Sequence, residues 1–244
     1  MKQDGYQPRD YRRWVGGTGL VTFNVTVRET DLAISAAEDL ERKARRIILK
    51  YRAQLEDYIA ANPKFQSSLE PLTQPAHAPR IVTTMIEASR KAGVGPMAAV
   101  AGALAEEVGR ELLAFSPEVI VENGGDIFLS VKHDRTIGLY AGDSPLTGRL
   151  GLEIKAAATP LGVCTSSGTV GHSLSFGKAD AVVVVSKSTA LADACATAIG
   201  NRVKKATDID GALRFGQRIE GVDGIVIVIG KDLGAWGDVT FRET

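Results

Sequence analysis

The chain has 244 residues, of which 44% are hydrophobic and 24% are charged, values typical of a globular protein with an ample core. Its 29 basic and 29 acidic residues balance, so composition favours neither a nucleic acid nor an anionic membrane as a partner. Two cysteines cannot form a disulfide framework and fit a reducing, cytoplasmic setting. Residues 1–14 lack the apolar core of a secretion signal, and no apolar run is long enough to span a bilayer. We therefore expect a cytoplasmic protein, as a monomer or a homo-oligomer.

The N-terminal part is predicted to combine one strand with helices. We expect residues 1–13 to form a loosely ordered arm and residues 14–244 to form a single domain. Residues 20–27 alternate between apolar and polar side chains, which predicts a strand. Residues 31–61 carry an apolar stripe at helical spacing, which predicts one long helix. The charged run 41–46 indicates a solvated helix face rather than a basic patch, because acidic residues interleave with basic ones.

The rest of the chain predicts a loop, two helices and a succession of strands. Residues 63–79 are rich in proline and indicate a connecting loop, and helices are expected over residues 80–92 and 96–114. Strands are expected at residues 119–122, 127–131, 136–140, 150–154, 181–185 and 224–229. Because the middle strands follow one another without helices between them, hairpins and antiparallel pairing are favoured. The fold class is therefore α+β, with largely antiparallel sheets and packed helices.

A carboxylate on the predicted helix after Ser188 is the most informative single feature. With Ser188 as the N-cap, Asp193 and Thr197 lie one turn apart on one face, among small residues. A carboxylate in such a niche needs a partner, because an unpaired buried charge is very costly. Carboxylate and hydroxyl oxygens are hard ligands that suit Mg²⁺ or Ca²⁺. Asp193 and Thr197 are therefore candidate metal ligands; the alternative is that Asp193 caps a helix or pairs with an arginine.

Two turns rich in glycine and hydroxyl groups are candidate ligand-binding segments. Asn123-Gly124-Gly125-Asp126 lies between two predicted strands. It is either a simple hairpin turn or a turn whose backbone groups contact the phosphate or the ring of a ligand. Thr165-Ser166-Ser167-Gly168 offers hydroxyl and backbone groups suited to a polar ligand. Both follow apolar segments, so we expect them to converge on one pocket.

His172 and Cys164 are the candidates for proton transfer and nucleophilic attack. His172 follows the second turn, and an imidazole suits a general base near neutral pH. The alternative is a structural or exposed histidine. Cys164 could act as a nucleophile with His172 as its base, but free cysteines are more often inert core residues, and Cys195 is expected to be one.

In this order, the two turns and the segment Asp193-Ala-x-x-Thr197-Ala198 resemble the ApbE superfamily, and specifically its smaller UPF0280 branch, over roughly residues 90–205. ApbE enzymes are magnesium-dependent transferases that split FAD and attach FMN to a threonine of a target protein. The resemblance implies an α+β fold of two T-fold-like halves, a flavin or another nucleotide diphosphate as ligand, and Mg²⁺ as cofactor. It implies that the two turns contact the nucleotide, that Asp193 and Thr197 bind the metal, and that His172 is the catalytic base.

The chain departs from the transferase pattern at several places, among them a short N-terminal half and a spacing from His172 to Asp193 that is several residues shorter than in typical transferases. Residues 171–177 lack the Ile-Asp-Pro-x-Thr-Gly continuation after the histidine, and residues 95–103 lack the lysine of the Ala-Lys-Gly motif. Family membership is thus better supported than transferase activity. The alternatives are a non-catalytic protein that binds a flavin or nucleotide, and a protein of sulfide or homocysteine metabolism that uses Cys164.

Overall fold

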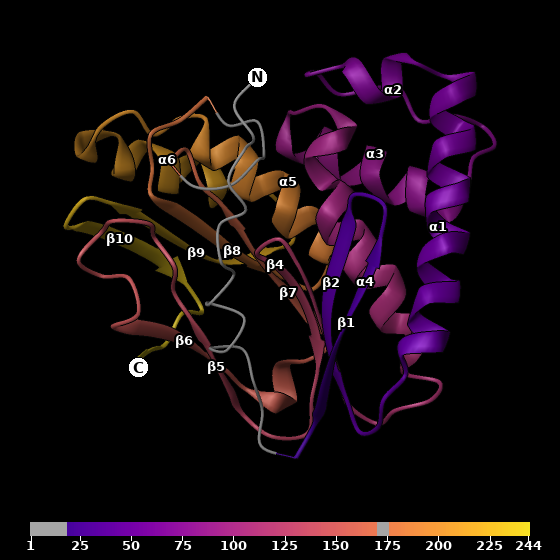
Figure 1. Ribbon diagram of the computed structural model, residues 1–244. Coiled ribbons are helices and arrows are strands. Elements are labelled where there is room, and N and C mark those ends of the chain that lie inside the picture. Colours follow the sequence, from indigo (N-terminus) through magenta and orange to yellow (C-terminus); the bar gives the residue numbers. More distant parts are fainter. Residues whose placement is uncertain (1–18, 170–175) are drawn as a thin grey trace, which may run out of the picture.

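The computed structural model describes residues 19–169 and 176–244, and within them an antiparallel sheet is covered by helices on one face (Figure 1). The N-terminal elements are β1 (Val21–Val27), β2 (Thr30–Ala36), α1 (Glu41–Ala61), α2 (Lys64–Ser67), α3 (Arg80–Ala92) and α4 (Val100–Leu112). The middle strands are β3 (Val119–Asn123), β4 (Asp126–Ser130), β5 (Arg135–Gly138), β6 (Leu150–Ile154) and β7 (Leu161–Ser166). The last elements are β8 (Ala181–Ser186), α5 (Thr189–Gly200), α6 (Ile209–Gly216), β9 (Val222–Ile229), β10 (Asp232–Gly237) and β11 (Phe241–Glu243).

The strands of the described residues form two sheets. The larger has eight strands in the order β1-β2-β3-β4-β7-β8-β9-β10, and the smaller has three in the order β11-β6-β5. Every neighbouring pair is antiparallel. Helices α1, α3, α4, α5 and α6 lie on one side of the large sheet, and β5 and β6 lie on the other (Figure 1). The predicted α+β class with largely antiparallel sheets is confirmed.

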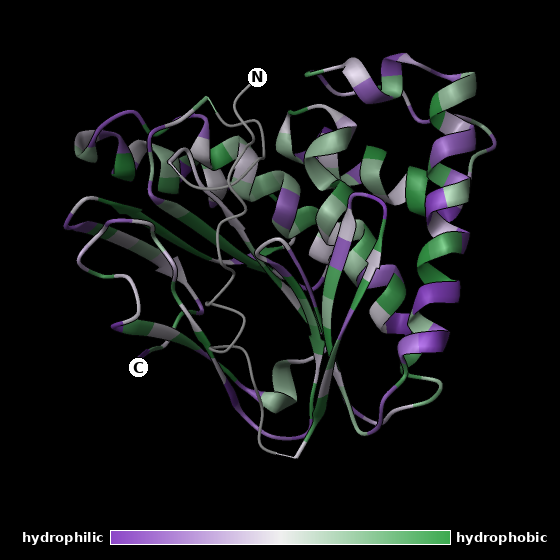
Figure 2. Ribbon diagram, in the orientation of Figure 1, coloured by the Kyte–Doolittle hydropathy of each residue, from purple (hydrophilic) through white to green (hydrophobic). Residues whose placement is uncertain are grey.

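The side-chain pattern of the central strands follows from these layers. In β4, Phe128 belongs to the core under the helices, whereas Ile127 and Leu129 belong to the core between the two sheets. All six residues of β8 are buried, because both faces of this strand are covered. Figure 2 shows this difference as hydrophobic central strands and an α1 that alternates between hydrophobic and hydrophilic residues.

The prediction of one helix over residues 31–61 is wrong at its start. Residues Thr30–Ala36 form β2, which pairs with β1 on one side and with β3 on the other, and α1 begins only at Glu41. The β1–β2 turn contains Arg28 with a positive φ of 53°, so neither glycine nor proline marks this hairpin. The expected helix over 96–114 is a 3-10 turn at Pro96–Ala99 followed by α4. The loop expected over residues 63–79 contains the short helix α2, and strands β7, β10 and β11 and helix α6 were not predicted either.

Among residues 19–169 and 176–244, every helix falls short of the length and apolarity that crossing a bilayer requires. The predicted arm, residues 1–13, lies outside the described residues.

Candidate functional site

The structure brings the two predicted turns side by side. Asn123 and Asp126 pair across the β3–β4 hairpin, and Gly124 and Gly125 between them have φ values of 66° and 105°. The hairpin interpretation is therefore correct, and these positive φ values explain the two glycines. Strand β4 also pairs with β7, which places Asp126 opposite Cys164. A Cβ atom on Gly125 would lie 3.8 Å from the Cβ and the carbonyl oxygen of Thr165, so the β3–β4 turn adjoins the end of β7.

The N-terminus of α4 adjoins both the turn and α5. The Asn123 side-chain amide donates to the carbonyl oxygen of Ala101 at 3.0 Å, which ties the turn to the first turn of α4. The backbone N–H of Gly102 donates to Asp193 Oδ2 at 2.8 Å. Because the first N–H groups of a helix have no partner within it, this carboxylate caps α4. The capping alternative for Asp193 thus accounts for one of its two oxygens.

Asp126 points into the same interface between the sheet and the helices. It lies two residues before Phe128 in β4 and so shares the face that packs against the helices, and only 7% of its surface is exposed. Its Oδ1 atom is buried and has no hydrogen-bond partner. Burial raises the pKa of Asp126 well above its ordinary value, and the negative charge of Asp193 raises it further.

The pKa of Asp193 is also raised by burial. Burial raises the pKa of Asp193 to about 7, against the opposing effect of the backbone N–H groups of Gly102 and Ala101. The buried carboxyl group of Asp126 and the half-buried carboxyl group of Asp193 therefore lie close enough to affect each other electrostatically, near the N-terminus of α4. A proton or a cation between Asp126 and Asp193 would remove the cost of this arrangement.

Thr197 and the second turn lie further along α5. Ser188 is the N-cap of α5 as predicted, and its hydroxyl accepts from the Leu191 N–H at 3.3 Å. Thr197 is half-buried one turn after Asp193. A Cβ atom on Gly200 would lie 3.6 Å from Ser166 Oγ, so the end of α5 covers the end of β7. The Ser166 hydroxyl is buried without a partner.

The remaining residues of the second turn are more exposed. The Gly168 N–H donates to the carbonyl oxygen of Ala179 at 2.9 Å, and the Ser167 and Thr169 hydroxyls lie 3.3 Å apart. The first residue of this segment, Thr165, is half-buried beside Gly125. The structure thus brings both turns, Asp193 and Thr197 to one region, and their convergence on a single ligand pocket stays a prediction. His172 lies outside the described residues.

Cys164 does not have the environment of a nucleophile. Its side chain is fully buried beneath α5, and its thiol donates to the carbonyl oxygen of Thr189 at 3.3 Å. Burial raises the pKa of Cys164 well above its ordinary value, and the charges of Asp126 and Asp193 raise it further. Since the thiolate is the reactive species, this thiol is inert at neutral pH. Cys195 is also buried, and burial raises its pKa to about 12.

The donor set fits a hard divalent cation. The available ligands are carboxylate and hydroxyl oxygens, and one buried carboxylate oxygen, Asp126 Oδ1, has no other partner. In the described part of the chain, no three His, Cys, Asp or Glu side chains gather as a metal-binding group. A cation here would therefore rely on the two aspartates together with hydroxyl, backbone or ligand oxygens.

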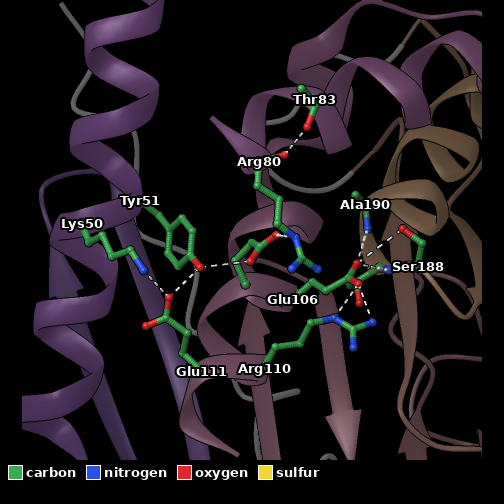
Figure 3. A network of polar contacts seen from close by, with 11 residues as sticks. Lys50, Tyr51, Arg80, Thr83, Glu106, Arg110, Glu111, Ser188 and Ala190 are labelled. Atoms are coloured by element: carbon green, nitrogen blue, oxygen red, sulfur yellow. Dashed lines mark hydrogen bonds and ion pairs between the residues drawn. The ribbon is translucent and has the colours of Figure 1, made fainter. Parts of the chain in front are cut away.

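Sequence reasoning missed two carboxylates that support this region. Glu122 is buried, and its Oε1 atom accepts from the Gly125 N–H at 2.8 Å, which holds the β3–β4 turn. Glu106 of α4 accepts from the Thr189 N–H at 2.8 Å and also pairs with Arg110 at 2.8 Å (Figure 3). The spacing of Glu106 and Arg110 is that of an ordinary solvated helix face, so the sequence carries no signal for the contact with α5.

Comparisons with known proteins agree with this architecture. The family model described as "AbpE bacteria" matches residues 12–233. A UPF0280 protein of Methanocella arvoryzae is 44% identical over 217 residues, which cover 88% of this chain and 88% of that protein. A UPF0280 protein of Methanocaldococcus jannaschii is 45% identical over 221 residues, covering 88% of this chain and 90% of that protein.

Solved structures of low sequence identity share the fold. A mutant of the flavin transferase ApbE from Vibrio cholerae superposes with a TM-score of 0.58 at 12% identity, covering 89% of this chain and 96% of that one. The ApbE protein of Thermotoga maritima superposes with a TM-score of 0.52 at 14% identity, covering 88% of this chain and 96% of that one. With the family match and the close relatives, these likenesses confirm the resemblance seen in the sequence: this chain belongs to the ApbE-like family, in its UPF0280 branch.

Proposed function

We propose that this protein binds FAD or a related nucleotide diphosphate together with Mg²⁺, and cleaves the pyrophosphate or transfers the flavin nucleotide. The observation that carries the proposal is the pair of neighbouring carboxyl groups, buried Asp126 and half-buried Asp193, beside two turns and the N-terminus of α4. Solved structures with this fold include flavin transferases, which supports a flavin as the ligand. Because both cysteines are free, a reducing compartment, the cytoplasm, is part of the proposal.

The roles of the residues follow from their positions. Asp193 and Thr197 would hold the cation, and Asn123, Gly124, Gly125 and Asp126 with Thr165, Ser166, Ser167 and Gly168 would line the nucleotide site. When bound, Mg²⁺ supplies positive charge to the pyrophosphate oxygens as the bond to the leaving phosphate breaks. In our proposal His172 takes the proton of the attacking hydroxyl group, so that the hydroxyl oxygen can bond to phosphorus while AMP leaves.

A second candidate is a protein that binds the flavin or nucleotide without chemistry. The observation that favours it is the segment Gly95–Ala103 at the start of α4, which has no lysine where the transferases carry one. The third candidate, a thiol enzyme built on Cys164, is disfavoured by the complete burial of that thiol and its raised pKa.

Incubation of the purified protein with FAD and Mg²⁺, followed by chromatographic separation of FAD, FMN and AMP, tests the first candidate. We expect AMP to be released, EDTA to abolish the release, and His172→Ala to lower kcat/KM about a hundredfold or more. If FAD binds but no AMP is released, with or without a threonine-containing acceptor peptide, the second candidate holds. If FAD does not bind, the flavin assignment is wrong.

A further inference from the structure

Three buried polar side-chain atoms without hydrogen-bond partners lie along the contact between β4, β7 and α5. Buried polar side-chain atoms almost always have a hydrogen-bond partner, so each exception asks for an explanation. Five such atoms occur in residues 19–169 and 176–244: Arg52 Nε, Asp126 Oδ1, Arg135 Nε, Ser166 Oγ and Thr189 Oγ1. The two arginines form ion pairs through their other nitrogens. The other three atoms lie on β4, β7 and the first residue of α5.

The register of these elements places Asp126 near Asp193, and Ser166 further along, beside the end of α5. Cys164 and Ser166 share the face of β7 that α5 covers, since Cys164 donates to Thr189 and Ser166 lies beside Gly200. Asp126 is the partner of Cys164 across the β4–β7 ladder. The stretch of α5 that carries Asp193 and Thr197 therefore runs above Asp126 and Ser166.

The carboxylates in this space lack the partners that usually neutralise buried charge. Asp193 Oδ2 is bound to the Gly102 N–H, whereas Asp126 Oδ1 has no partner. No arginine, lysine or histidine of the described residues forms an ion pair with either aspartate. A divalent cation would satisfy the free oxygen of Asp126 and neutralise both carboxylates, because hard cations prefer such ligands.

We propose that Asp126 is a direct ligand of the divalent cation, which it shares with Asp193, with the Ser166 hydroxyl at the edge of the same site. This inference rests on the cation site of the proposed function and changes the role of Asp126 from contacting the nucleotide to binding the metal. With two carboxylates, the site is electrically neutral once a divalent cation is bound. The cation is then held in the absence of nucleotide, and the pyrophosphate of a ligand joins a site that is already loaded.

Binding of Mn²⁺ alone, followed by calorimetry and by the loss of the free-Mn²⁺ electron paramagnetic resonance signal, tests the inference without any flavin or turnover. The variants are Asp126→Asn and Asp193→Asn, with Asp134→Asn as a matched control on an aspartate that pairs with Lys155 at the surface. We expect Asp126→Asn to weaken Mn²⁺ binding at least tenfold and Asp134→Asn to leave it unchanged. We also expect the melting temperature of metal-free Asp126→Asn to equal or exceed that of the wild type, because asparagine is neutral without binding a proton or a cation.

Wild-type affinity for Mn²⁺ in Asp126→Asn, together with lost binding in Asp193→Asn, would overturn the role of Asp126 and leave the cation site of the proposed function intact. Wild-type affinity in both variants would overturn both assignments. Asp126→Ser, which keeps one oxygen in a smaller side chain, is measured in parallel and judged by the same criterion, so that poor folding of one variant does not decide the result. A metal-free protein that binds Mn²⁺ with no saturable site also overturns the inference.

Discussion

Asp193 of α5 accepts a hydrogen bond from the backbone N–H of Gly102, at 2.8 Å, in the first turn of α4. The reverse contact is present as well: Glu106 of α4 accepts from the Thr189 N–H, at 2.8 Å, in the first turn of α5 (Figure 3). Each helix thus caps the other with a carboxylate, where free N–H groups and the helix dipole favour negative charge. This reciprocal arrangement fixes the position of Asp193 relative to β4 and β7, and so determines the geometry of the candidate site.

The closeness of α4 and α5 depends on Gly102. A Cβ atom at this position would lie 2.5 Å from the carbonyl oxygen of Thr189 and 2.8 Å from Asp193 Cβ. We predict that Gly102→Ala lowers the free energy of unfolding by about 1–3 kcal/mol, as overpacking does. Gly211→Ala on α6 is the matched control, because nothing lies within 4 Å of its Cβ position, and it should stabilise by about 0.5–1 kcal/mol. Chemical denaturation measures both, and equal effects at the two sites would contradict the close contact.

Loss of the carboxylate of Glu106 should weaken the start of α5. Glu106→Ala removes the acceptor for the buried Thr189 N–H, which water cannot easily replace, and the partner of Arg110, which is exposed enough to be hydrated. We expect a loss of about 1–3 kcal/mol in the free energy of unfolding, the range for a lost cap and for buried groups left unpaired. Glu41→Ala removes an exposed partner at the same spacing, from Arg45, and should cost less than about 1 kcal/mol. Similar losses of unfolding free energy in Glu106→Ala and Glu41→Ala would show that the buried contact stabilises the protein no more than the exposed ion pair does.

The sequence predicts the framework of this fold better than its long-range pairings. The runs that became α3, β6 and β8 were predicted within a residue or two, because their local patterns and their environments agree. The helix predicted over residues 31–61 rests on an apolar stripe that begins only at Leu40, whereas the pairing of Thr30–Ala36 with both β1 and β3 makes that segment a strand. Such pairing depends on partners far along the chain and overrides local propensity.

In the candidate site, too, local features could be predicted from the sequence and long-range contacts could not. The glycines of the β3–β4 turn and the N-cap at Ser188 are local features, and both were predicted. The contact of Asp193 with Gly102 joins residues 91 positions apart, and that of Glu106 with Thr189 joins residues 83 apart. No periodicity or motif in a single sequence encodes such contacts, so the reciprocal capping emerged only from the fold.

Both cysteines should resist alkylation while the protein is folded. Burial raises the pKa of Cys164 well above its ordinary value and that of Cys195 to about 12, so neither forms a thiolate near pH 8. We expect iodoacetamide at pH 8 to modify neither residue in the native protein and both in denaturant, as measured by mass spectrometry. If Cys164 in the native protein were modified at the rate of a free cysteine, the prediction would be wrong and the thiol-enzyme alternative would be favoured.

The metal-free protein should lose stability as the pH rises from about 4 to about 7. The pKa of Asp193 is about 7 in the folded protein, above the ordinary value of 3.8, so the folded state holds a proton that the unfolded state releases. The stabilisation from that proton is complete at low pH and is lost as the pH rises through 7. Unfolding measured in EDTA should show the stability of the wild type relative to Asp193→Asn falling over this interval and levelling above it. A difference that does not change with pH would contradict the raised pKa.

The central claim, a cation site at Asp193 that serves a flavin nucleotide, is tested most directly by titrating FAD with and without Mg²⁺ and following its fluorescence. Asp193→Asn is the decisive variant, because its amide oxygen can still accept from the Gly102 N–H while the negative charge is gone. We predict that Mg²⁺ strengthens FAD binding at least tenfold in the wild type and has no effect in Asp193→Asn, whose melting temperature does not fall below that of the wild type. The account would be contradicted if Mg²⁺ did not change the FAD affinity of the wild type, or if it changed the FAD affinity of Asp193→Asn by the same factor.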